Sequence, residues 1–493
     1  MPLLLLFAAV IRLIRLAEPE ELVFDETYYA KDACLYLGYR PEQCGLTGTA
    51  EQSYVHPPLG KWLIAAGIKL FGNDSFGWRI SAVVFGVALV LVTYLLAEKL
   101  FQNRWISLVS GLLVATDFLL FVQSRIAMLD IFLAFFVALG FLFIAMDRNA
   151  AAAVRDHLEC EKDGPPPERR IGKRIASGIA FGLALSVKWS AVYALAAAAL
   201  LGLGWTVGLW RLRRKRARPA EPVDAKRAGD NSARGEGWGV LARDVVWTGV
   251  AFGLVPLMVY VGSYSEWFVL ENSKPCAYTV PAASEDRYFS AGFYGLVEGE
   301  CLTGAAGLTL NFADLHDRVA DYHLQLTATH PYQSKAWTWP LVLRPVAYFY
   351  EGASGRSSEI IGMANVATWY AALLALIWLV ARSIRSWRPE TVVLAAFAAQ
   401  YVPWLVVSRP LFFFYMTPSV PFLMIGLAAG LNALRRKGRG GRRLVLVFLV
   451  VGVGVMTVIF FPILTAIELD YDLWQKLMWI PHFDCGGLKC GWI

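Results

Sequence analysis

The chain alternates between long runs of apolar residues and short polar segments. A bilayer-spanning helix needs about 20 residues, and eleven runs approach or exceed that length. Continuous runs favour helices over the alternating segments of a membrane β-barrel. The pattern predicts an all-α polytopic membrane protein with about 11 transmembrane helices. They lie near residues 3–16, 77–97, 105–122, 127–146, 174–187, 189–210, 241–262, 361–381, 391–407, 411–434 and 444–466.

The first run is short and carries Arg12 and Arg15. We interpret it as a retained helix rather than a cleaved signal peptide, because no small-residue cleavage site of the usual form follows it. Composition agrees with a membrane protein: 57% of the 493 residues are hydrophobic and 17% are charged. These values exclude a cytosolic enzyme and a disordered chain.

The basic residues predict the orientation of the chain in the membrane. Of the 46 Lys and Arg residues, 28 lie in the loops after the second, fourth, sixth, eighth and tenth runs. Loops rich in Lys and Arg remain in the cytoplasm, so the N-terminus is predicted inside and the C-terminus outside. The net charge of +7 is therefore a sign of topology and not of a nucleic-acid partner.

This orientation divides the chain, taken as one membrane domain over 1–493, into four parts. Residues 17–76 form a first extracytoplasmic loop, 77–262 hold the second to seventh spans, 263–360 form a large extracytoplasmic loop, and 361–493 hold the last four spans and an outer tail.

Cysteine placement agrees with this topology. Six of the seven cysteines fall on the predicted outer side, two to a segment, and Cys160 falls in a cytoplasmic loop. Disulfides form outside the cytoplasm, so local pairing within each segment is predicted. A zinc site is the weaker alternative, because no histidine cluster accompanies the thiols. The six residues are Cys34, Cys44, Cys276, Cys301, Cys485 and Cys490.

The acid pair Asp25-Glu26 begins the first outer loop. Capping of a helix N-terminus explains such a pair equally well. The same loop carries the segment from His56 to Lys61, with two prolines that fix the chain before an amphipathic run. His56 alone is typical of a structural histidine, and the combination favours a site.

Charged residues also stand at the outer ends of several spans, where charge near membrane depth suggests function. For each one alone, a snorkelling or topology-setting role is the simpler interpretation. Together they bring cations to the face that carries the acid pair. They are Arg79, Arg125, Asp130, Lys188 and Arg409. Asp117, within the run 105–122, either pairs with a cation or caps a break in the helix.

This combination suits sugar transfer from a lipid phosphate. The phosphate is already a good leaving group, so no general acid is needed, whereas the acceptor hydroxyl needs a base. Cations stabilise the charge that develops on the departing phosphate. The chain has no glycine-rich nucleotide fingerprint and no phosphate loop. No cofactor and no metal site are predicted, since the short Asp470-Tyr471-Asp472 motif is too common to be specific.

The motifs resemble those of the protein O-mannosyltransferases in their bacterial form. The resemblance runs from the first span to the last. It rests on Phe24-Asp25-Glu26, on His56 to Lys61, on Arg79, on Arg125 with Leu129-Asp130, on Lys188-Trp189, on the segment from His330 to Pro340, on Arg344-Pro345-Val346, on the segment from Ile360 to Asn365 with Trp369, and on Arg409 with Phe412, Tyr415 and Pro418.

The resemblance implies a GT-C glycosyltransferase that moves mannose from polyprenyl phosphate mannose to Ser or Thr of proteins leaving through the secretion machinery. It implies a multi-pass enzyme of the cell membrane with an extracytoplasmic site, in contact with membrane lipids. Asp25 would be the catalytic base and Glu26 its neighbour in acceptor handling. Arg79, Arg125, Lys188 and Arg409 would bind the donor lipid phosphate, and the further active-site candidates are His56, Lys61, Asp130, His330 and Trp337.

The chain departs from the eukaryotic members in three places. The loop 263–360 is too short for their β-trefoil (MIR) domain, Tyr54 stands where they often carry an acid, and Gly362-Met363-Ala364-Asn365 replaces the usual Gly-Asn-Pro form. Two other functions fit the same pattern. One is a related GT-C transferase with a lipid, glycan or arabinan acceptor. The other, a lipid flippase or transporter, predicts inverted repeats and midplane polar residues, whereas the polar residues here gather at the outer ends of spans.

Overall fold

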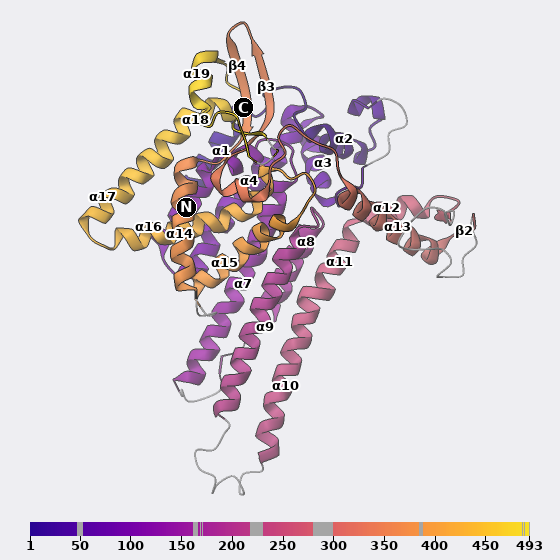
Figure 1. Cartoon of the computed structure of the whole chain (residues 1–493). Helices are drawn as coiled ribbons and strands as arrows, with labels where there is room; N and C mark the ends of the chain where they lie inside the picture. Colours follow the sequence, from indigo (N-terminus) through magenta and orange to yellow (C-terminus); the bar gives the residue numbers. More distant parts are fainter. Residues whose placement is uncertain are drawn as a thin grey trace.

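The computed structural model is a bundle of long helices with most of its irregular structure at one end (Figure 1). It describes residues 1–46, 53–160, 166–167, 169, 171–216, 230–279, 299–383, 388–485, 487 and 489–492, with the backbone alone for 216 and 230–237. Parts of the predicted loops 17–76 and 263–360 therefore lie outside the described residues.

The helices are α1 (Pro2–Leu13), α2 (Glu26–Tyr36), α3 (Leu59–Phe71), α4 (Ser75–Phe101), α5 (Arg104–Thr116), α6 (Phe118–Gln123), α7 (Asp130–Glu159), α8 (Gly172–Leu185), α9 (Ala191–Arg216), α10 (Asp230–Gly249), α11 (Val255–Ser263), α12 (Ser265–Asn272), α13 (Gly304–Gln325), α14 (Val366–Arg382), α15 (Pro389–Tyr401), α16 (Val420–Arg435), α17 (Arg439–Val447), α18 (Met456–Leu464) and α19 (Tyr471–Leu477).

Short 3₁₀ segments are η1 (Pro41–Cys44), η5 (Ala336–Leu341), η6 (Val402–Val406) and η7 (Phe413–Ser419), and π segments are η3 (Val250–Leu254) and η8 (Phe448–Val455). The strands are β1 (Tyr278–Thr279), β2 (Cys301–Leu302), β3 (Val346–Ala353), β4 (Arg356–Gly362), β5 (Leu469–Asp470), β6 (Phe483–Asp484) and β7 (Lys489–Cys490).

Several helices are long and apolar enough to cross a bilayer, as a multi-pass membrane protein requires. Within the described chain there are six of them, at Ser75–Phe101, Asp130–Glu159, Ala191–Lys215, Trp238–Ser263, Phe413–Arg435 and Arg439–Leu464. Shorter apolar helices are α1, α5 and α14. The fold is therefore mostly helical and membrane-embedded.

The predicted span over 105–122 is divided at Asp117. Helix α5 ends at Thr116 and α6 begins at Phe118. The Asp117 carboxylate accepts a hydrogen bond of 3.0 Å from the backbone N–H of Leu120, and one of 2.9 Å from the indole of Trp369. Of the two alternatives for this residue, the cap is the one observed, because the carboxylate satisfies a free N–H at the start of α6.

Helix α7 lies at the centre of the bundle and packs against α4, α8 and α9. Small residues permit this close approach. A Cβ atom added to Gly140 would stand 2.7 Å from the ring of Phe181 on α8. One added to Gly178 would stand 1.9 Å from the carbonyl oxygen of Ala251. These glycines hold the neighbours of α7 in place, and α7 positions the site through its first residue, Asp130.

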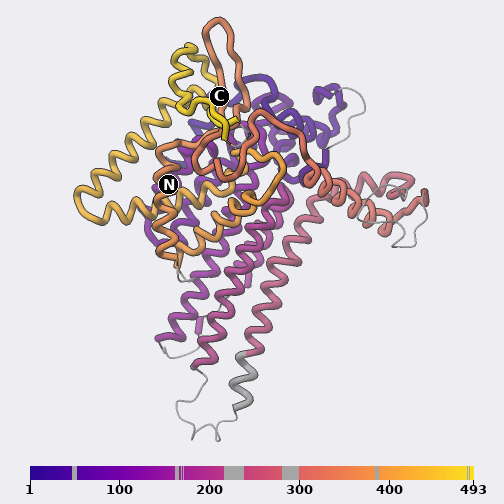
Figure 2. The backbone as a smooth tube through the Cα atoms, viewed as in Figure 1, coloured from indigo at the N-terminus to yellow at the C-terminus, as the bar shows by residue number. Residues whose placement is uncertain are grey.

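We call the end of the bundle that carries the β3–β4 hairpin the hairpin end. The hairpin is antiparallel, with Val346 opposite Gly362, and β5 adds to the edge of β4. It projects beyond the helices, while α12 and α13 extend sideways from the top of α11 (Figure 2). The opposite ends of α7, α9 and α10 lie far from the hairpin in both views (Figure 1).

The predicted local disulfides are confirmed. Cys34 pairs with Cys44, Cys276 with Cys301 and Cys485 with Cys490, and Cys160 is free and exposed.

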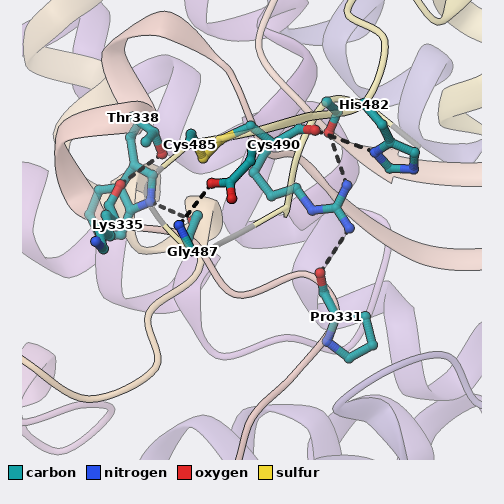
Figure 3. Close-up of a disulfide and its surroundings, with 12 residues drawn as sticks. Pro331, Lys335, Thr338, His482, Cys485, Gly487 and Cys490 are labelled. Carbon is teal, nitrogen blue, oxygen red and sulfur yellow. Dashed lines mark hydrogen bonds between the residues drawn. A yellow bond between two sulfur atoms is a disulfide. The ribbon is translucent and has the colours of Figure 1, made fainter.

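The last disulfide closes a tail that folds back onto the segment before η5 (Figure 3). The Arg344 guanidinium donates to the carbonyl oxygens of Gly491, at 3.1 Å, and Pro331, at 2.8 Å. Since charge-assisted bonds of this kind are strong, the tail fixes the loop that carries His330.

Candidate active site

Asp25 occupies the turn between α1 and α2, outside the membrane-spanning helices. The preceding residue, Phe24, has a φ of 49°, a left-handed conformation that is rare for a large side chain. Its ring packs edge-on against His330, Tyr348 and Phe414, at centroid distances of 5.7, 5.2 and 5.8 Å. These contacts hold the strained backbone and thereby fix where the Asp25 carboxylate stands.

The Asp25 side chain does not cap α2, so the alternative of a simple helix cap is not what the structure has. Instead the Tyr29 hydroxyl, one turn later, donates a long hydrogen bond of 3.4 Å to Oδ2. Burial raises the pKa of Asp25 to about 6, although the nearby charge of Lys188 opposes the shift. A carboxylate with a pKa near neutrality is suited to general-base chemistry.

The resemblance implies that Glu26 takes part in acceptor handling. In the structure its carboxylate faces into the protein and supports the site. It is wholly buried. Its carboxylate accepts hydrogen bonds from the backbone N–H groups of Val23, at 2.9 Å, and Ala127, at 2.7 Å, and two from Arg79. This carboxylate is fully engaged, and it ties the Asp25 turn to α4 and to the segment before α7.

Arg79, for which the resemblance implies a contact to the lipid phosphate, has all its donors engaged within the protein. All its guanidinium nitrogens donate within the protein, to Glu26 at 2.9 Å and to the carbonyl oxygens of Leu16, Pro19 and Glu21. Its side chain is wholly buried. A guanidinium has five N–H donors, and these five bonds use them all, so none remains for a phosphate.

Arg125 is a second cation with a structural role in place of the expected donor contact. Its Nη1 donates to the carbonyl oxygens of Arg12 and Ile14, each at 2.6 Å, and its Nη2 donates to that of Arg15 at 3.0 Å. These carbonyl groups lie at the end of α1 and in the turn that follows it, where a cation is favourable. Arg125 therefore caps α1 and holds the chain that leads to Asp25.

The two remaining cations, Lys188 and Arg409, line a cavity of about 530 Å³ at the hairpin end, which we call the Lys188 pocket. Lys188 Nζ lies 2.7 Å from Oδ2 of Asp130, the first residue of α7. The same ammonium lies 5.7 Å from the ring centre of Tyr415, and the Arg409 guanidinium lies 5.8 Å from it. The polar lining is His56, Asp130, Lys188, Trp189, Ser190, Tyr193, His323, Ser408, Arg409 and Tyr415.

Two histidines complete the wall of the Lys188 pocket. The His323 Nε2 lies 3.0 Å from the Val55 carbonyl oxygen, so that nitrogen carries the proton, and Arg409 donates to Nδ1 at 3.3 Å. The His56 ring lies tilted against that of His323, with centroids 5.4 Å apart, and against that of Tyr29, with centroids 6.0 Å apart. Burial and the surrounding cations lower the pKa of both histidines, so both are neutral.

Lys61, Trp337 and His330 lie outside the Lys188 pocket. Lys61 is buried on α3 in an ion pair of 2.8 Å with Asp32 and donates to the Ser53 carbonyl oxygen, so its role is structural. Trp337, half exposed, lines a groove of about 560 Å³ that shares Arg409 with the Lys188 pocket. His330 packs against Phe24 beside Asp25, and burial lowers its pKa.

Sequence reasoning did not single out Tyr29, Trp189, His323 or Tyr415 as site residues. Tyr29 follows Asp25 by one helical turn, a spacing that places both on one face. His316 and His323 are seven residues apart on α13 and also share a face. The stacking of Trp189 on His316, at 5.8 Å, depends on contacts between distant segments, and no local pattern predicts it.

Comparison with known families gives two matches. The model of the dolichyl-phosphate-mannose-protein mannosyltransferases matches residues 73–223, and the model of the C-terminal four-helix membrane region of protein O-mannosyltransferases matches residues 309–483.

Two curated relatives match almost the whole chain. The polyprenol-phosphate-mannose–protein mannosyltransferase of Mycolicibacterium smegmatis is 30% identical over 97% of this chain and 91% of its own length. The protein of the same name from Mycobacterium tuberculosis is 28% identical over 98% of this chain and 91% of its own length.

Among solved structures, the Saccharomyces cerevisiae Pmt1–Pmt2 complex bound to the sugar donor superposes with a TM-score of 0.70, at 16% identity, over 99% of this chain and 92% of that one. ArnT of Cupriavidus metallidurans, bound to undecaprenyl phosphate, superposes with a TM-score of 0.54, at 18% identity, over 91% of this chain and 63% of that one.

The fold is that of the GT-C membrane glycosyltransferases, because the two solved structures above superpose on more than nine-tenths of the chain. At the finer level, the chain belongs to the family of protein O-mannosyltransferases.

Proposed function

We propose that this protein transfers mannose from polyprenyl phosphate mannose to Ser or Thr hydroxyl groups of proteins. The family and the names of the relatives support the donor and the protein acceptor. The observation that carries the assignment to this site is Asp25, a carboxylate whose pKa is raised to about 6 by burial and on which the charge of Lys188 acts. A base and a phosphate-binding cation are the two groups that such a transfer needs.

In the proposed reaction the Asp25 carboxylate takes the proton of the acceptor hydroxyl. The hydroxyl oxygen forms a bond to the anomeric carbon of mannose, while the bond from that carbon to the phosphate oxygen breaks. The electron pair of that bond leaves with the polyprenyl phosphate, and Lys188 and Arg409 stabilise the added negative charge. A single displacement of this kind inverts the anomeric centre.

The surrounding pocket supports the binding of an anion. Asp130 holds the Lys188 ammonium in place at 2.7 Å. The histidines on the pocket wall are neutral, so they offer no acidic proton to Asp25. We propose that the acceptor polypeptide approaches along the Trp337 groove, because that groove meets the Lys188 pocket at Arg409. His330 lies beside the Asp25 turn and would contact the acceptor.

We also propose the finer topology: eleven spans, a cytoplasmic N-terminus and an extracytoplasmic C-terminus, in the cell membrane. In this arrangement the hairpin end faces the outside, where proteins emerge from the secretion machinery. Two observations support this orientation: the basic loops lie on the predicted cytoplasmic side together with the free Cys160, and the three disulfides lie in the segments predicted on the outer side. We further propose that transfer needs no resident cofactor, and addition of a chelator to the transfer assay tests whether a metal takes part.

The test of the function is transfer of labelled mannose from polyprenyl phosphate mannose to a peptide rich in Ser, Thr and Pro, in membranes that contain the full chain. We expect Asp25→Asn to abolish labelling of the peptide, since the amide cannot accept the proton. Glu20→Gln removes an exposed carboxylate of the same loop and is the matched control, for which we expect unchanged labelling.

Other outcomes have definite meanings. Equal labelling by the natural protein and Asp25→Asn would show that another group is the base. Label in lipid or glycan with none in peptide would show that the acceptor is not a protein, as in the related transferases.

A further inference from the structure

A second charged cavity lies at the end of the bundle opposite the candidate active site. It has a volume of about 600 Å³ and lies between α7, α8, α9 and α10. Its lining includes Asp147 of α7, which is 17 residues beyond Asp130, so the two cavities are roughly 26 Å apart along that helix. We call it the distal cavity, and it takes no part in the proposed sugar transfer.

The distal cavity has a rigid inner wall. Asp147 is wholly buried, and its carboxylate accepts hydrogen bonds of 2.9 Å from Arg169 and 3.2 Å from Arg174. Arg174 also donates to the hydroxyl of Thr206 on α9, at 2.9 Å, and of Thr248 on α10, at 2.7 Å. This network joins four helices, so the cavity is a built feature and not a gap between mobile ends.

The distal cavity carries more positive charge than its two aspartates neutralise. Four arginines face two aspartates in the lining, which leaves an excess of two positive charges. Arg213 of α9 makes no hydrogen bond and no ion pair with any residue that the structure describes. Arg243 of α10 is 68% exposed, with only a loose contact of 3.9 Å to Asp244. Two guanidinium groups are thus free to bind an anion, and their planar donors match phosphate oxygens.

The rim of the distal cavity is apolar on the side of the bundle surface. Trp247 lines the cavity and is 42% exposed, and its neighbour Val246 is 63% exposed. Tryptophan beside arginine is typical of the boundary between lipid tails and headgroups. Basic pockets between helices at this depth bind phosphate headgroups.

We propose that the distal cavity binds a phosphate group through Arg213 and Arg243, carried either by the headgroup of an anionic membrane lipid or by a free phosphate ion. Its inner wall is held by the contact between Asp147 and Arg174. In the topology proposed above, the cavity faces the cytoplasmic leaflet, but phosphate binding itself does not depend on that orientation or on sugar transfer.

The test is native mass spectrometry of the full chain in detergent, with phosphatidylglycerol and, separately, phosphatidylcholine of the same acyl chains. The double substitution Arg213→Gln with Arg243→Gln removes both free guanidinium groups. The control, Arg211→Gln with Lys215→Gln, removes the same charge from exposed positions of α9 that do not line the cavity. We expect the natural protein and the control to prefer phosphatidylglycerol, and the cavity variant to bind it roughly tenfold more weakly.

Inorganic phosphate forms the other arm of the experiment. If inorganic phosphate displaces phosphatidylglycerol from the natural protein, the site takes the phosphate group itself. The same conclusion follows if no lipid binds but inorganic phosphate does, in a way that depends on the two arginines. If displacement fails while the lipid preference depends on the arginines, the headgroup within a lipid is required. The proposal would be overturned if the Arg213→Gln with Arg243→Gln variant bound phosphatidylglycerol and inorganic phosphate as well as the Arg211→Gln with Lys215→Gln control does.

A variant that keeps the charges guards against loss of folding. Arg213→Lys with Arg243→Lys should retain most of the lipid preference if the cavity holds an anion by charge. If the lysine variant is well folded but binds as weakly as the glutamine variant, charge alone does not hold the anion. The proposal then stands only if the natural protein still prefers phosphatidylglycerol to phosphatidylcholine, a preference that would rest on the bidentate geometry of arginine.

Discussion

The guanidinium of Arg79 donates two hydrogen bonds of 2.9 Å to the carboxylate of Glu26, and neither side chain is exposed. Glu26 adjoins Asp25 in the sequence, yet it faces into the protein, while the side-chain partner of the Asp25 carboxylate is the Tyr29 hydroxyl at 3.4 Å and the charge of Lys188 acts on it. Two adjacent carboxylates therefore have separate tasks. One fixes the turn from within, and the other remains available for chemistry.

Loss of one member of this pair should destabilise the protein rather than weaken donor binding alone. Glu26→Gln leaves a buried guanidinium without its counter-charge, a change that costs about 3–5 kcal/mol. We expect a markedly lower melting temperature of the purified protein. Arg104→Gln, at an exposed position, is the control. An unchanged melting temperature together with a raised KM for the donor would instead return Arg79 and Glu26 to substrate binding.

The rate of transfer should depend on pH through Asp25. Since the base must be unprotonated and burial raises its pKa to about 6, kcat/KM should rise about tenfold per pH unit below pH 6 and level off above it. The Tyr29 hydroxyl stabilises the charged form. Tyr29→Phe should therefore raise the pKa and move this limb of the profile to higher pH. A limb that moves down, or does not move, would separate Tyr29 from Asp25.

Removal of the pocket cations should slow the chemical step. Lys188→Gln and Arg409→Gln each withdraw a charge from the leaving phosphate, and we expect a loss of about a hundredfold in kcat. Because Lys188→Gln also leaves Asp130 unpaired, Lys188→Gln with Asp130→Asn should be measured beside it. Lys489→Gln, on the exposed tail, serves as the control. Comparable losses in all variants would point to general electrostatics and not to a phosphate site.

Cysteine accessibility should report the topology. Cys160 is the free and exposed thiol, while the other six are paired. In sealed cells, a membrane-impermeant maleimide should leave the native protein unlabelled, and it should label Cys160 once the membrane is opened. Cys160→Ser should then remain unlabelled in both conditions. Labelling of Cys160 in intact cells would reverse the proposed orientation.

The local disulfides should add stability. Cys34 and Cys44 are ten residues apart, and closure of a loop of that size is worth about 2–3 kcal/mol on the entropic model. Cys34→Ala with Cys44→Ala should lower the melting temperature. Reduction of the natural protein breaks all three disulfides and should lower it at least as much. A stable variant would show that α2 and η1 are held by their other contacts.

Much of this protein could be predicted from its sequence, because the relevant physics is local. Each apolar run must by itself be long enough to cross the bilayer and must satisfy its own backbone hydrogen bonds, so the long helices were predictable. Cysteines close in sequence pair within their segments, and all three such pairs are present. The motifs around Asp25, Lys188 and Arg409 were sufficient to place the chain in its family.

Only the tertiary structure decided which charged residues line the candidate pocket. Arg79, Arg125, Lys61, Lys188 and Arg409 are all cations near one end of the bundle, and their sequence context does not separate them. The fold gives the first three their partners within the protein: Glu26, the carbonyl groups of α1, and Asp32. Lys188 and Arg409 also have neighbours, Asp130 and His323, but both line an open pocket. The physical reason is that the sign of a charge is set by one residue, whereas its remaining hydrogen-bonding capacity is set by what distant segments bring beside it.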